Sequence, residues 1–166
     1  MPRKRLPSNT ETAPVTERLA IASDHAAFEM KAALAEWLRA AGHEVLDLGT
    51  HSGDRVDYPD YGYALAEALA EGKADKGIAL CGSGIGISIA ANRHPACRCA
   101  RVSEPYSAAL AREHNDANAI ALGARLIGLD MAKACIEAFL TAGFEGGRHA
   151  GRVDKLTHPR FAKEHA

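Results

Sequence analysis

The chain has 166 residues, of which 47% are hydrophobic and 25% charged, and its formal net charge is -1 at pH 7. This length and balance are typical of one compact domain with a real core. The near-neutral charge excludes the basic surface with which proteins bind nucleic acid or anionic membranes, and no apolar stretch is long enough to span a bilayer. We therefore expect neither a nucleic-acid nor a membrane partner.

The amino-terminal segment 1–18 has the composition of a tail. It contains three prolines and a basic run, but no apolar core of the kind that a signal peptide has. Glu11 and Glu17 argue against a transit peptide. We predict a disordered tail over 1–18, one domain over 19–156 and a carboxyl-terminal tail over 157–166.

The first elements after this tail alternate between strand and helix. An apolar run over 19–22 predicts a strand. Apolar residues at helical spacing, from Met30 to Ala41, predict a helix, and Gly42 suits the position that follows its last turn. A second strand is predicted over 45–48.

The alternation continues along the rest of the chain. We predict further strands over 78–80, 99–102 and 119–122, and helices over 61–71, 105–114 and 129–142. Strands separated by helices imply a parallel sheet that is covered on both faces, with right-handed crossovers. The predicted fold class is α/β, a Rossmann-like three-layer sandwich with a five-stranded parallel sheet.

A glycine-rich loop follows the third predicted strand and reads Cys81-Gly82-Ser83-Gly84-Ile85-Gly86. Glycine lets a backbone turn sharply and approach a ligand closely, and the N–H groups at a helix start attract anions and lower the pKa of a nearby thiol. The loop can therefore offer a base and a cradle for an oxyanion. Ligands of such sheets bind beyond the carboxyl ends of the strands. That rule also selects the segments 24–25, 103–104 and 123–125.

The four cysteines, at positions 81, 97, 99 and 135, do not form the pattern of a disulfide framework in a chain of this size. A reducing cytoplasm is the simpler interpretation. Cys97 and Cys99 are one residue apart, and no second Cys/His pair at zinc-finger spacing accompanies them. We interpret this pair as small buried side chains and expect neither a metal nor another cofactor.

Several motifs occur in an order that resembles one enzyme family. They are Asp24-His25, the Cys81–Gly86 loop, Ser103-Glu104-Pro105-Tyr106-Ser107, His114-Asn115-Asp116, Gly123-Ala124-Arg125 and Glu145-Gly146-Gly147-Arg148-His149. Together they resemble the B-type ribose-5-phosphate isomerases, which belong with the lactose-pathway galactose-6-phosphate isomerases, over residues 19–156. The resemblance implies interconversion of ribose 5-phosphate and ribulose 5-phosphate through an enediolate, as part of the pentose phosphate pathway.

The resemblance also implies roles for individual residues in catalysis. Cys81 matches the family's thiolate base, since the glutamate that some members place a few residues later is replaced here by Ile87-Ser88. Ser83 and the N–H groups of the loop glycines are expected to hold the enediolate oxygen. His114 matches the ring-opening acid/base, although a histidine at a helix end is otherwise often a partner of the helix dipole.

Further residues match substrate-binding positions. They are Asp24, His25, Tyr58, Gly82, Gly84, Ile85, Gly86, Asn115, Arg125, Arg148 and Arg152. Asp24 also stands where a helix N-cap belongs, and Tyr58 suits the core as well as a sugar pocket. Two arginines four residues apart share a helix face and suit a phosphate dianion. The resemblance further implies a homodimer with shared active sites, a dimer of dimers being left open, and the segment 148–152 is a candidate for crossing between subunits.

Other functions remain as alternatives. A dinucleotide-binding loop needs its third glycine at position 87, which is Ile87, and should follow the first strand. A cysteine phosphatase needs an arginine within 81–88, a redox pair needs C-x-x-C, and a metal-dependent isomerase needs a cluster of carboxylates and histidines, none of which is recognisable. The nearest alternative is the same chemistry on a six-carbon substrate, allose 6-phosphate or galactose 6-phosphate.

Overall fold

The computed structural model describes residues 16–161, so most of the predicted amino-terminal tail and residues 162–166 lie outside the described residues. The described strands are β1 (Arg18–Ser23), β2 (Glu44–Asp47), β3 (Lys76–Cys81), β4 (Cys99–Arg101) and β5 (Ala119–Gly123). The helices are α1 (Phe28–Ala40), α2 (Tyr58–Ala70), α3 (Ile85–Ala91), α4 (Pro105–Asn115), α5 (Leu129–Thr141), α6 (Ala150–Thr157) and the short 3-10 helices η1 (His25–Ala27) and η2 (Gly147–His149). None of the helices within 16–161 is long and apolar enough to cross a membrane.

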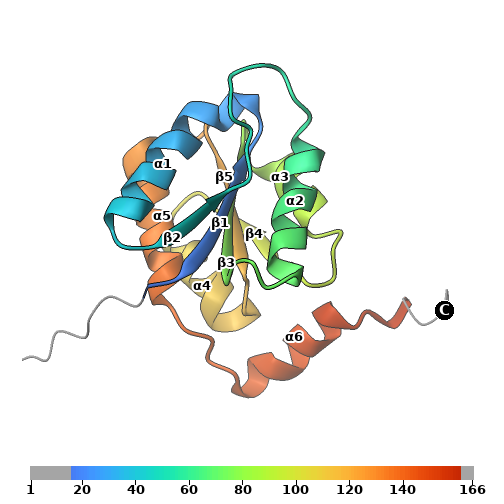
Figure 1. Cartoon of the computed structure of the whole chain (residues 1–166). Helices are drawn as coiled ribbons and strands as arrows, with labels where there is room; N and C mark the ends of the chain where they lie inside the picture. Colours follow the sequence, from blue (N-terminus) through green and yellow to red (C-terminus); the bar gives the residue numbers. More distant parts are fainter. Residues whose placement is uncertain (1–15, 162–166) are drawn as a thin grey trace, which may run out of the picture.

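All five strands are parallel and form one sheet in the order β2-β1-β3-β5-β4, which confirms the predicted fold class (Figure 1). The edge of the sheet at which the strands end is called the carboxyl edge below, and the opposite one the amino edge. The strand order reverses between β1 and β3. In open α/β sheets a reversal of this kind leaves a crevice outside the carboxyl ends of the two strands.

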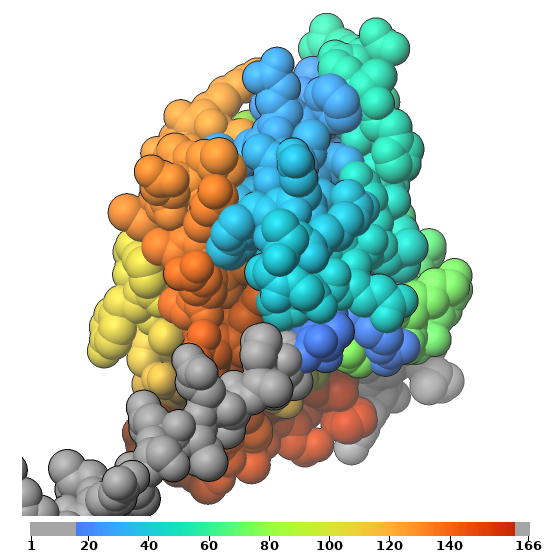
Figure 2. Space-filling view, turned by 60° about the vertical axis from the view of Figure 1, so that its left-hand side comes forward, coloured from blue at the N-terminus to red at the C-terminus, as the bar shows by residue number. Residues whose placement is uncertain are grey.

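The two faces of the sheet carry side chains of different size, because successive residues of a strand point to opposite faces. The larger ones pack with α1, α4 and α5, and they are Leu19, Ile21, Ile78, Leu80, Ile120 and Leu122. The smaller ones pack with α2 and α3, and they are Ala20, Ala22, Ala79, Ala119 and Ala121. Helices α1 and α5 lie side by side on the first face (Figures 1 and 2).

The alanine face belongs to a tightly packed part of the molecule. Helix α2 approaches α3 at Gly62, where an added Cβ would lie 2.8 Å from the Cβ of Ala90 and 2.9 Å from the carbonyl oxygen of Ile87. No side chain fits there without a shift of the helices. Helix α3, which continues the glycine-rich loop, is therefore held in place by close backbone packing at Gly62 together with its buried Ile87 side chain.

The limits of some elements differ from the prediction. Helix α2 begins at Tyr58, three residues before the predicted start at 61, because Pro59 fits the first turn, where no N–H is required. Helix α6 was not predicted. It is short, only Val153 of its residues is buried, and it lies apart from the sheet at the amino edge (Figure 1). The predicted domain limits, 19–156, stay a prediction.

Candidate active site

A cavity of about 560 Å³ opens at the carboxyl edge, beside the reversal of strand order. It is lined by Asp24, Tyr58, Cys81, Gly82, Ser83, Ile85, Gly86, Ile89, Arg125 and Leu126. Eight of these were predicted from the sequence as site residues, and the structure brings them together from four separate segments. The two that were not predicted, Ile89 and Leu126, are exposed apolar side chains at 60% and 57%.

The Cys81 side chain is one of the groups that line this cavity. Cys81 is the last residue of β3 and is only 4% exposed. Its Sγ accepts a hydrogen bond from the N–H of Gly84 at 3.1 Å, an interaction that stabilises negative charge on sulfur. Gly84 has φ +75°, and a Cβ there would lie 2.9 Å from the carbonyl carbon of Leu122, so both its backbone conformation and its surroundings require glycine.

Ser83 is positioned through its backbone carbonyl. The carbonyl oxygen accepts a hydrogen bond from Nε of Arg101 at 3.1 Å, and the hydroxyl accepts one from the N–H of Ile85 at 3.2 Å. Gly123 at the end of β5 lets the loop pass closely, because an added Cβ would lie 2.6 Å from the same carbonyl oxygen. Arg101 was not predicted as a site residue, because nothing in the sequence of its strand indicates a contact with the loop.

The segment that follows β1 contributes Asp24 to the cavity but not His25. Asp24 is 7% exposed, and its Oδ1 accepts a hydrogen bond from the N–H of Ala26 at 3.0 Å, so it is the N-cap of η1 as well as a wall of the cavity. His25 lies outside the cavity lining. Its Nδ1 lies 3.2 Å from the backbone nitrogen and 3.1 Å from the carbonyl oxygen of Val56, so the ring is held against that residue.

Two larger side chains form the walls on either side of the glycine-rich loop. Tyr58 is 42% exposed and its ring lies against Gly86, where an added Cβ would be 2.6 Å from the ring. The exposed Arg125 covers Gly82, with Nη1 3.3 Å from the position of an added Cβ, and its backbone N–H donates to the carbonyl oxygen of Gly82 at 3.0 Å. Tyr58 therefore belongs to the cavity rather than to the core, and Arg125 brings a positive charge to it.

The remaining predicted residues lie at the amino edge. His114 and Asn115 end α4, and the next strand, β5, starts beside the start of β3, where Ala119 pairs with Gly77. Cys81 is four residues further along β3, which at roughly 3.3 Å per residue corresponds to about 13 Å. Arg148 and Arg152, on η2 and α6, are exposed near the end of α4. One chain therefore does not bring these four residues to the Cys81 thiol.

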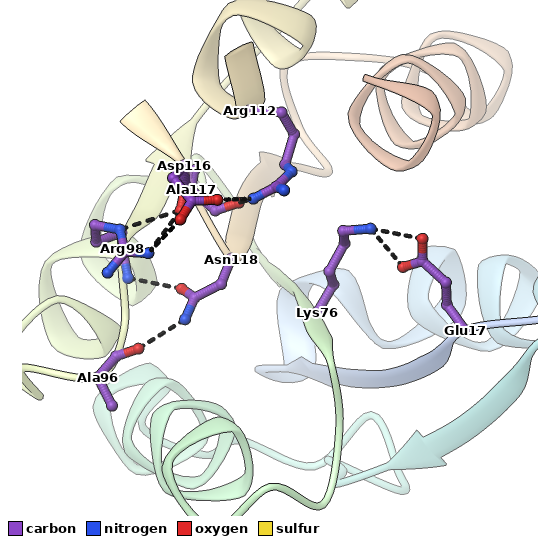
Figure 3. Close-up of polar contacts among 8 residues, drawn as sticks. All are labelled: Glu17, Lys76, Ala96, Arg98, Arg112, Asp116, Ala117 and Asn118. Carbon is purple, nitrogen blue, oxygen red and sulfur yellow. Dashed lines mark hydrogen bonds and ion pairs between the residues drawn. The ribbon is translucent and has the colours of Figure 1, made fainter. Parts of the chain in front are cut away.

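A network of ionic contacts holds the turn that follows His114 and Asn115 (Figure 3). Asp116 has φ +45°, a left-handed conformation that aspartate tolerates better than most residues. Its Oδ1 lies 2.8 Å from Nη1 of Arg112, and its Oδ2 lies 3.2 Å from Nη2 of Arg98. The two arginines also donate to the carbonyl oxygens of Ala117 and Asp116. The end of α4 is thus held by an arginine of α4 itself and by one from the loop before β4.

His114 stacks on His149, with ring centroids 4.3 Å apart and ring planes 10° from parallel. Oε2 of Glu145 lies 3.4 Å from Nε2 of His149 and 3.9 Å from Nε2 of His114. Burial, together with the nearby charge of Arg148 and the stacked His114, lowers the pKa of His149. Glu145 and His149 belong to one of the motifs of the family resemblance, but Arg148 was the residue of that motif for which a role was predicted.

The other three cysteines lie in the interior. Burial raises the pKa of Cys97 to about 12, although Arg98 opposes this effect, and burial raises the pKa values of Cys99 and Cys135 as well. These thiols stay protonated at neutral pH and pack as small apolar side chains. Cys81 is the cysteine that lines the cavity at the carboxyl edge.

Comparisons with known proteins agree on one family. Residues 19–156 match the family described as Ribose/Galactose Isomerase. The chain is 47% identical to ribose-5-phosphate isomerase B of Escherichia coli K12, over 85% of this chain and 95% of that protein. It is 42% identical to D-erythrulose-4-phosphate isomerase of Pectobacterium atrosepticum, over 89% of this chain and 97% of that protein. A ribose-5-phosphate isomerase B structure from Clostridium thermocellum matches with a TM-score of 0.86 and 46% identity, over 90% of this chain and 99% of that one.

Proposed function

The chain belongs to the ribose/galactose isomerase family, and from this premise we propose that it interconverts ribose 5-phosphate and ribulose 5-phosphate. It is an aldose–ketose isomerase, and its relatives include proteins named for that pentose reaction. The observation that carries the proposal is the Cys81 thiol at the end of β3, which accepts the N–H of Gly84 inside a cavity. That arrangement suits a base that works on carbon.

In the proposed reaction the Cys81 thiolate removes the proton from C2 of the open-chain aldose. The electron pair of that C–H bond forms the C1=C2 double bond, and negative charge develops on O1. A proton then passes from O2 to O1, and the Cys81 thiol returns its proton to C1, which gives the ketose. Base and acid are the same group, so the reaction needs no net proton from solvent.

Donors around the loop support the charge that develops on oxygen. The hydroxyl of Ser83 lines the cavity, and the N–H of Gly86 lies in the first turn of α3, where no helical carbonyl accepts it. The N–H of Gly84 is directed at the sulfur instead. Gly84 is therefore assigned to the base rather than to the oxyanion, as a refinement of the expectation that all loop glycines share one role.

Ring opening and phosphate binding are assigned to residues at the amino edge together with Arg125. His114 is placed as the acid/base that opens the sugar ring and Asn115 as a partner of sugar hydroxyls. Arg148 and Arg152 carry the guanidinium groups that suit a dianionic phosphate. Because Cys81 lies at the other edge of the sheet, these groups act on a substrate bound at the Cys81 of a second copy of the chain.

The surface around the Cys81 cavity supports a homodimer with shared sites. Ile85, Ile89, Leu126 and Tyr58 are between 42% and 60% exposed and together form an apolar rim of the cavity. Exposed apolar groups in one patch are typical of a surface that another chain covers. In a two-fold dimer that covers this rim, the rim of each chain is buried and two equivalent sites form.

The shared site is tested by complementation between two inactive variants. Cys81→Ala and His114→Ala are prepared separately, mixed, unfolded and refolded together. In a mixed dimer with shared sites, one site carries both substitutions and the other carries neither. With half of the dimers mixed, activity should return to about a quarter of the wild-type value. No recovery, while refolded wild-type protein regains its activity, would place both groups in one chain's site.

The substrate is tested with ribose 5-phosphate beside allose 6-phosphate, galactose 6-phosphate and D-erythrulose 4-phosphate, each with EDTA present. We expect the highest kcat/KM for ribose 5-phosphate, since relatives are named for that reaction. A higher value for a six-carbon or four-carbon sugar would keep the chemistry and change the substrate. Failure to convert any of the four would contradict the proposed function.

We also assign the enzyme to the cytoplasm. All four cysteines are free and buried, with no disulfide among residues 16–161, and the proposed mechanism needs Cys81 as a thiol. A reducing compartment maintains that state.

A further inference from the structure

Three side chains at the amino edge place possible metal-ligating atoms close to one another. They are His114 at the end of α4, Glu145 in the segment after α5, and His149 in η2. Their ligand atoms all lie within 4.8 Å of one another. Among residues 16–161 this is the one group of three or more histidine, cysteine, aspartate or glutamate side chains placed in this way.

His149 supplies a second and independent observation. Its side chain is buried, with 5% of the residue exposed, and its Nε2 has no hydrogen-bond partner within the described part of the chain. A buried polar atom without a partner costs about 1–3 kcal/mol, so buried nitrogens normally have one. Oε2 of Glu145 lies 3.4 Å from this nitrogen, but outside hydrogen-bond geometry. A cation between the two atoms would satisfy both.

The backbone holds the three residues together. The N–H of Glu145 donates to the carbonyl oxygen of Glu113 at 3.0 Å, which fixes the segment to the last turn of α4. Gly146 and Gly147 follow with φ of +65° and +53°, conformations that favour glycine, and they turn the chain so that His149 returns to the side of Glu145. The two histidines come from elements 35 positions apart in sequence and still stack at 4.3 Å.

We propose that His114, Glu145 and His149 form a binding site for a divalent transition-metal cation, with Zn²⁺ as the best fit. Two imidazole nitrogens and one carboxylate oxygen are a ligand set that Zn²⁺ accepts, at about 2.0–2.2 Å per bond, with the fourth position left open. Such bonds place tetrahedral ligand atoms about 3.3 Å apart. The 3.4 Å separation of His149 and Glu145 already matches this, whereas His114 must come closer to Glu145 than 3.9 Å. The His114 ring must also turn out of its stack on His149, because the lone pairs of two nearly parallel rings do not meet at one point.

The side chains that must move are free to do so. The side chains of Glu145 and His114 are 48% and 35% exposed, so both can tilt toward a cation while the buried His149 stays in place. The charges of Arg148 and Arg152 act against cation binding, but both side chains are exposed and solvent screens them. Their repulsion lowers the affinity for a cation, so the site is expected to bind its metal reversibly rather than hold it permanently.

A cation at this site would act as an inhibitor of the proposed isomerase. Metal binding takes the Nε2 lone pair of His114, the group assigned to ring opening, so cyclic substrate can no longer be opened there. This consequence rests on the proposed function, whereas the binding of the cation does not. The two are therefore measured separately, first without sugar and then with it.

Binding is measured by titrating the wild-type protein with Zn²⁺ in a calorimeter, and with Co²⁺ while its visible absorption is followed. We expect one ion per chain and the intense Co²⁺ bands that four-coordinate sites give. Glu145→Gln and His149→Ala should each weaken Zn²⁺ binding by at least about 100-fold, more than the loss of an outer-shell partner usually costs. Because Glu145 is half-exposed, its variant folds even where the His149 variant does not.

Two control variants make the result specific. His158→Ala removes a histidine that also lies beside a carboxylate four residues away, Asp154 at 3.1 Å, but without a third ligand, and it should leave binding unchanged. Cys81→Ala should do the same. No stoichiometric binding, or binding that is lost with Cys81 and retained in Glu145→Gln and His149→Ala, would overturn the site.

If binding is shown, Zn²⁺ should inhibit turnover reversibly, with EDTA restoring it, and Glu145→Gln should require about 100-fold more Zn²⁺ for the same inhibition. If Glu145→Gln instead needs the same Zn²⁺ concentration as the wild type, inhibition does not act through this site.

Discussion

The two edges of the sheet are built in different ways. At the carboxyl edge the cavity is shaped by backbone, because Gly84, Gly86 and Gly123 lie where an added Cβ would be within 2.9 Å of a neighbouring atom. At the amino edge the arrangement depends on side chains, with Arg98 and Arg112 holding Asp116 and with two stacked histidines beside Glu145. The first edge is complete within one chain. The second presents exposed arginines and a half-exposed histidine, as expected of groups that meet substrate from a second chain.

The difference shows how a proton-transfer site can be divided. The group that takes the proton from carbon must be held rigidly, since a small misplacement of a base costs much of the rate. The groups proposed to open the ring and to hold the phosphate would act at a greater distance from that carbon. Substitutions at the carboxyl edge should therefore lower kcat, whereas those at the amino edge should raise KM.

The largest effect is expected at the carboxyl edge. Cys81→Ala removes the base, so kcat should fall by about 10² or more while KM stays close to the wild-type value. Steady-state kinetics with ribose 5-phosphate measure both, and circular dichroism verifies the fold. Cys135→Ala is the control, since it removes a fully buried thiol of α5 that does not line the cavity. Near-normal turnover by Cys81→Ala would refute the assignment of the base.

A backbone substitution at the same edge should come next. In Gly123→Ala the new Cβ would lie 2.6 Å from the carbonyl oxygen of Ser83, so the loop must shift, and kcat should fall by about 10- to 100-fold. Gly128→Ala adds the same methyl group where nothing lies within 4 Å, and its kcat should stay within about twofold of wild type. Equal kcat values for the two variants would show that the loop tolerates movement, against the rigid edge described here.

At the amino edge the effect should appear in KM. Arg148→Ala and Arg152→Ala each remove one guanidinium group from the proposed phosphate site, so KM for ribose 5-phosphate should rise about tenfold with kcat little changed. Arg39→Ala, an exposed arginine near the end of α1, is the matched control. If both variants keep the wild-type KM, the phosphate is bound elsewhere and the amino edge loses that role.

The smallest effect on activity concerns an ion pair that supports the carboxyl edge. Nζ of the buried Lys31 lies 2.6 Å from Oδ1 of Asp47, at the end of β2, and the same carboxylate accepts the N–H of Gly49. Partial burial acts to raise the pKa of Asp47, but these contacts together hold it below its ordinary value. The pair therefore contributes stability above the ordinary aspartate pKa, and this contribution is lost as the pH falls through the lower pKa of the folded state.

In Lys31→Met this contribution is absent, so the free energy of unfolding should be about 2 kcal/mol lower at pH 7 and should no longer fall with acid over that range. Urea unfolding at several pH values measures the difference. Lys133→Met removes a half-buried positive charge that lies over the Trp37 ring rather than beside a carboxylate, and it serves as the control. An acid profile of Lys31→Met identical to wild type would show that Asp47 does not depend on the pair.

The strands and the Cys81 cavity were predictable because both follow from local patterns. Short apolar runs, alternating with segments whose apolar residues recur at helical spacing, predicted all five strands. Because ligands of parallel sheets bind beyond the carboxyl ends of the strands, Asp24, Cys81 and Arg125 were predicted at one edge, where the structure has them. The strand order was not predictable, since alternation alone does not say on which side of β1 each new strand is added. Helix α6 was missed because it is short, with eight residues of which only one is buried, so few apolar side chains mark it in the sequence.

The amino edge was harder to predict. His114 and Asn115 were found only through the family resemblance, although their place before β5 already indicates the amino edge, because a crossover helix returns the chain to where the next strand starts. The approach of Glu145 and His149 to His114 had no signal in the spacing. It depends on the left-handed conformations of Gly146 and Gly147 and on one backbone hydrogen bond between Glu145 and Glu113.

The alanine face of the sheet limits how this sequence can diverge. On the other face, leucine and isoleucine can exchange with one another while the total volume is kept, and such exchanges are usually tolerated. On the alanine face the small side chains are fully buried, so we expect a larger one, such as valine in place of Ala79 or Ala121, to displace α2 and α3 and with them the loop that carries Cys81. Variation at these interior positions is therefore constrained by the chemistry as well as by stability, so a substitution far from substrate would be removed by selection as firmly as one in the cavity.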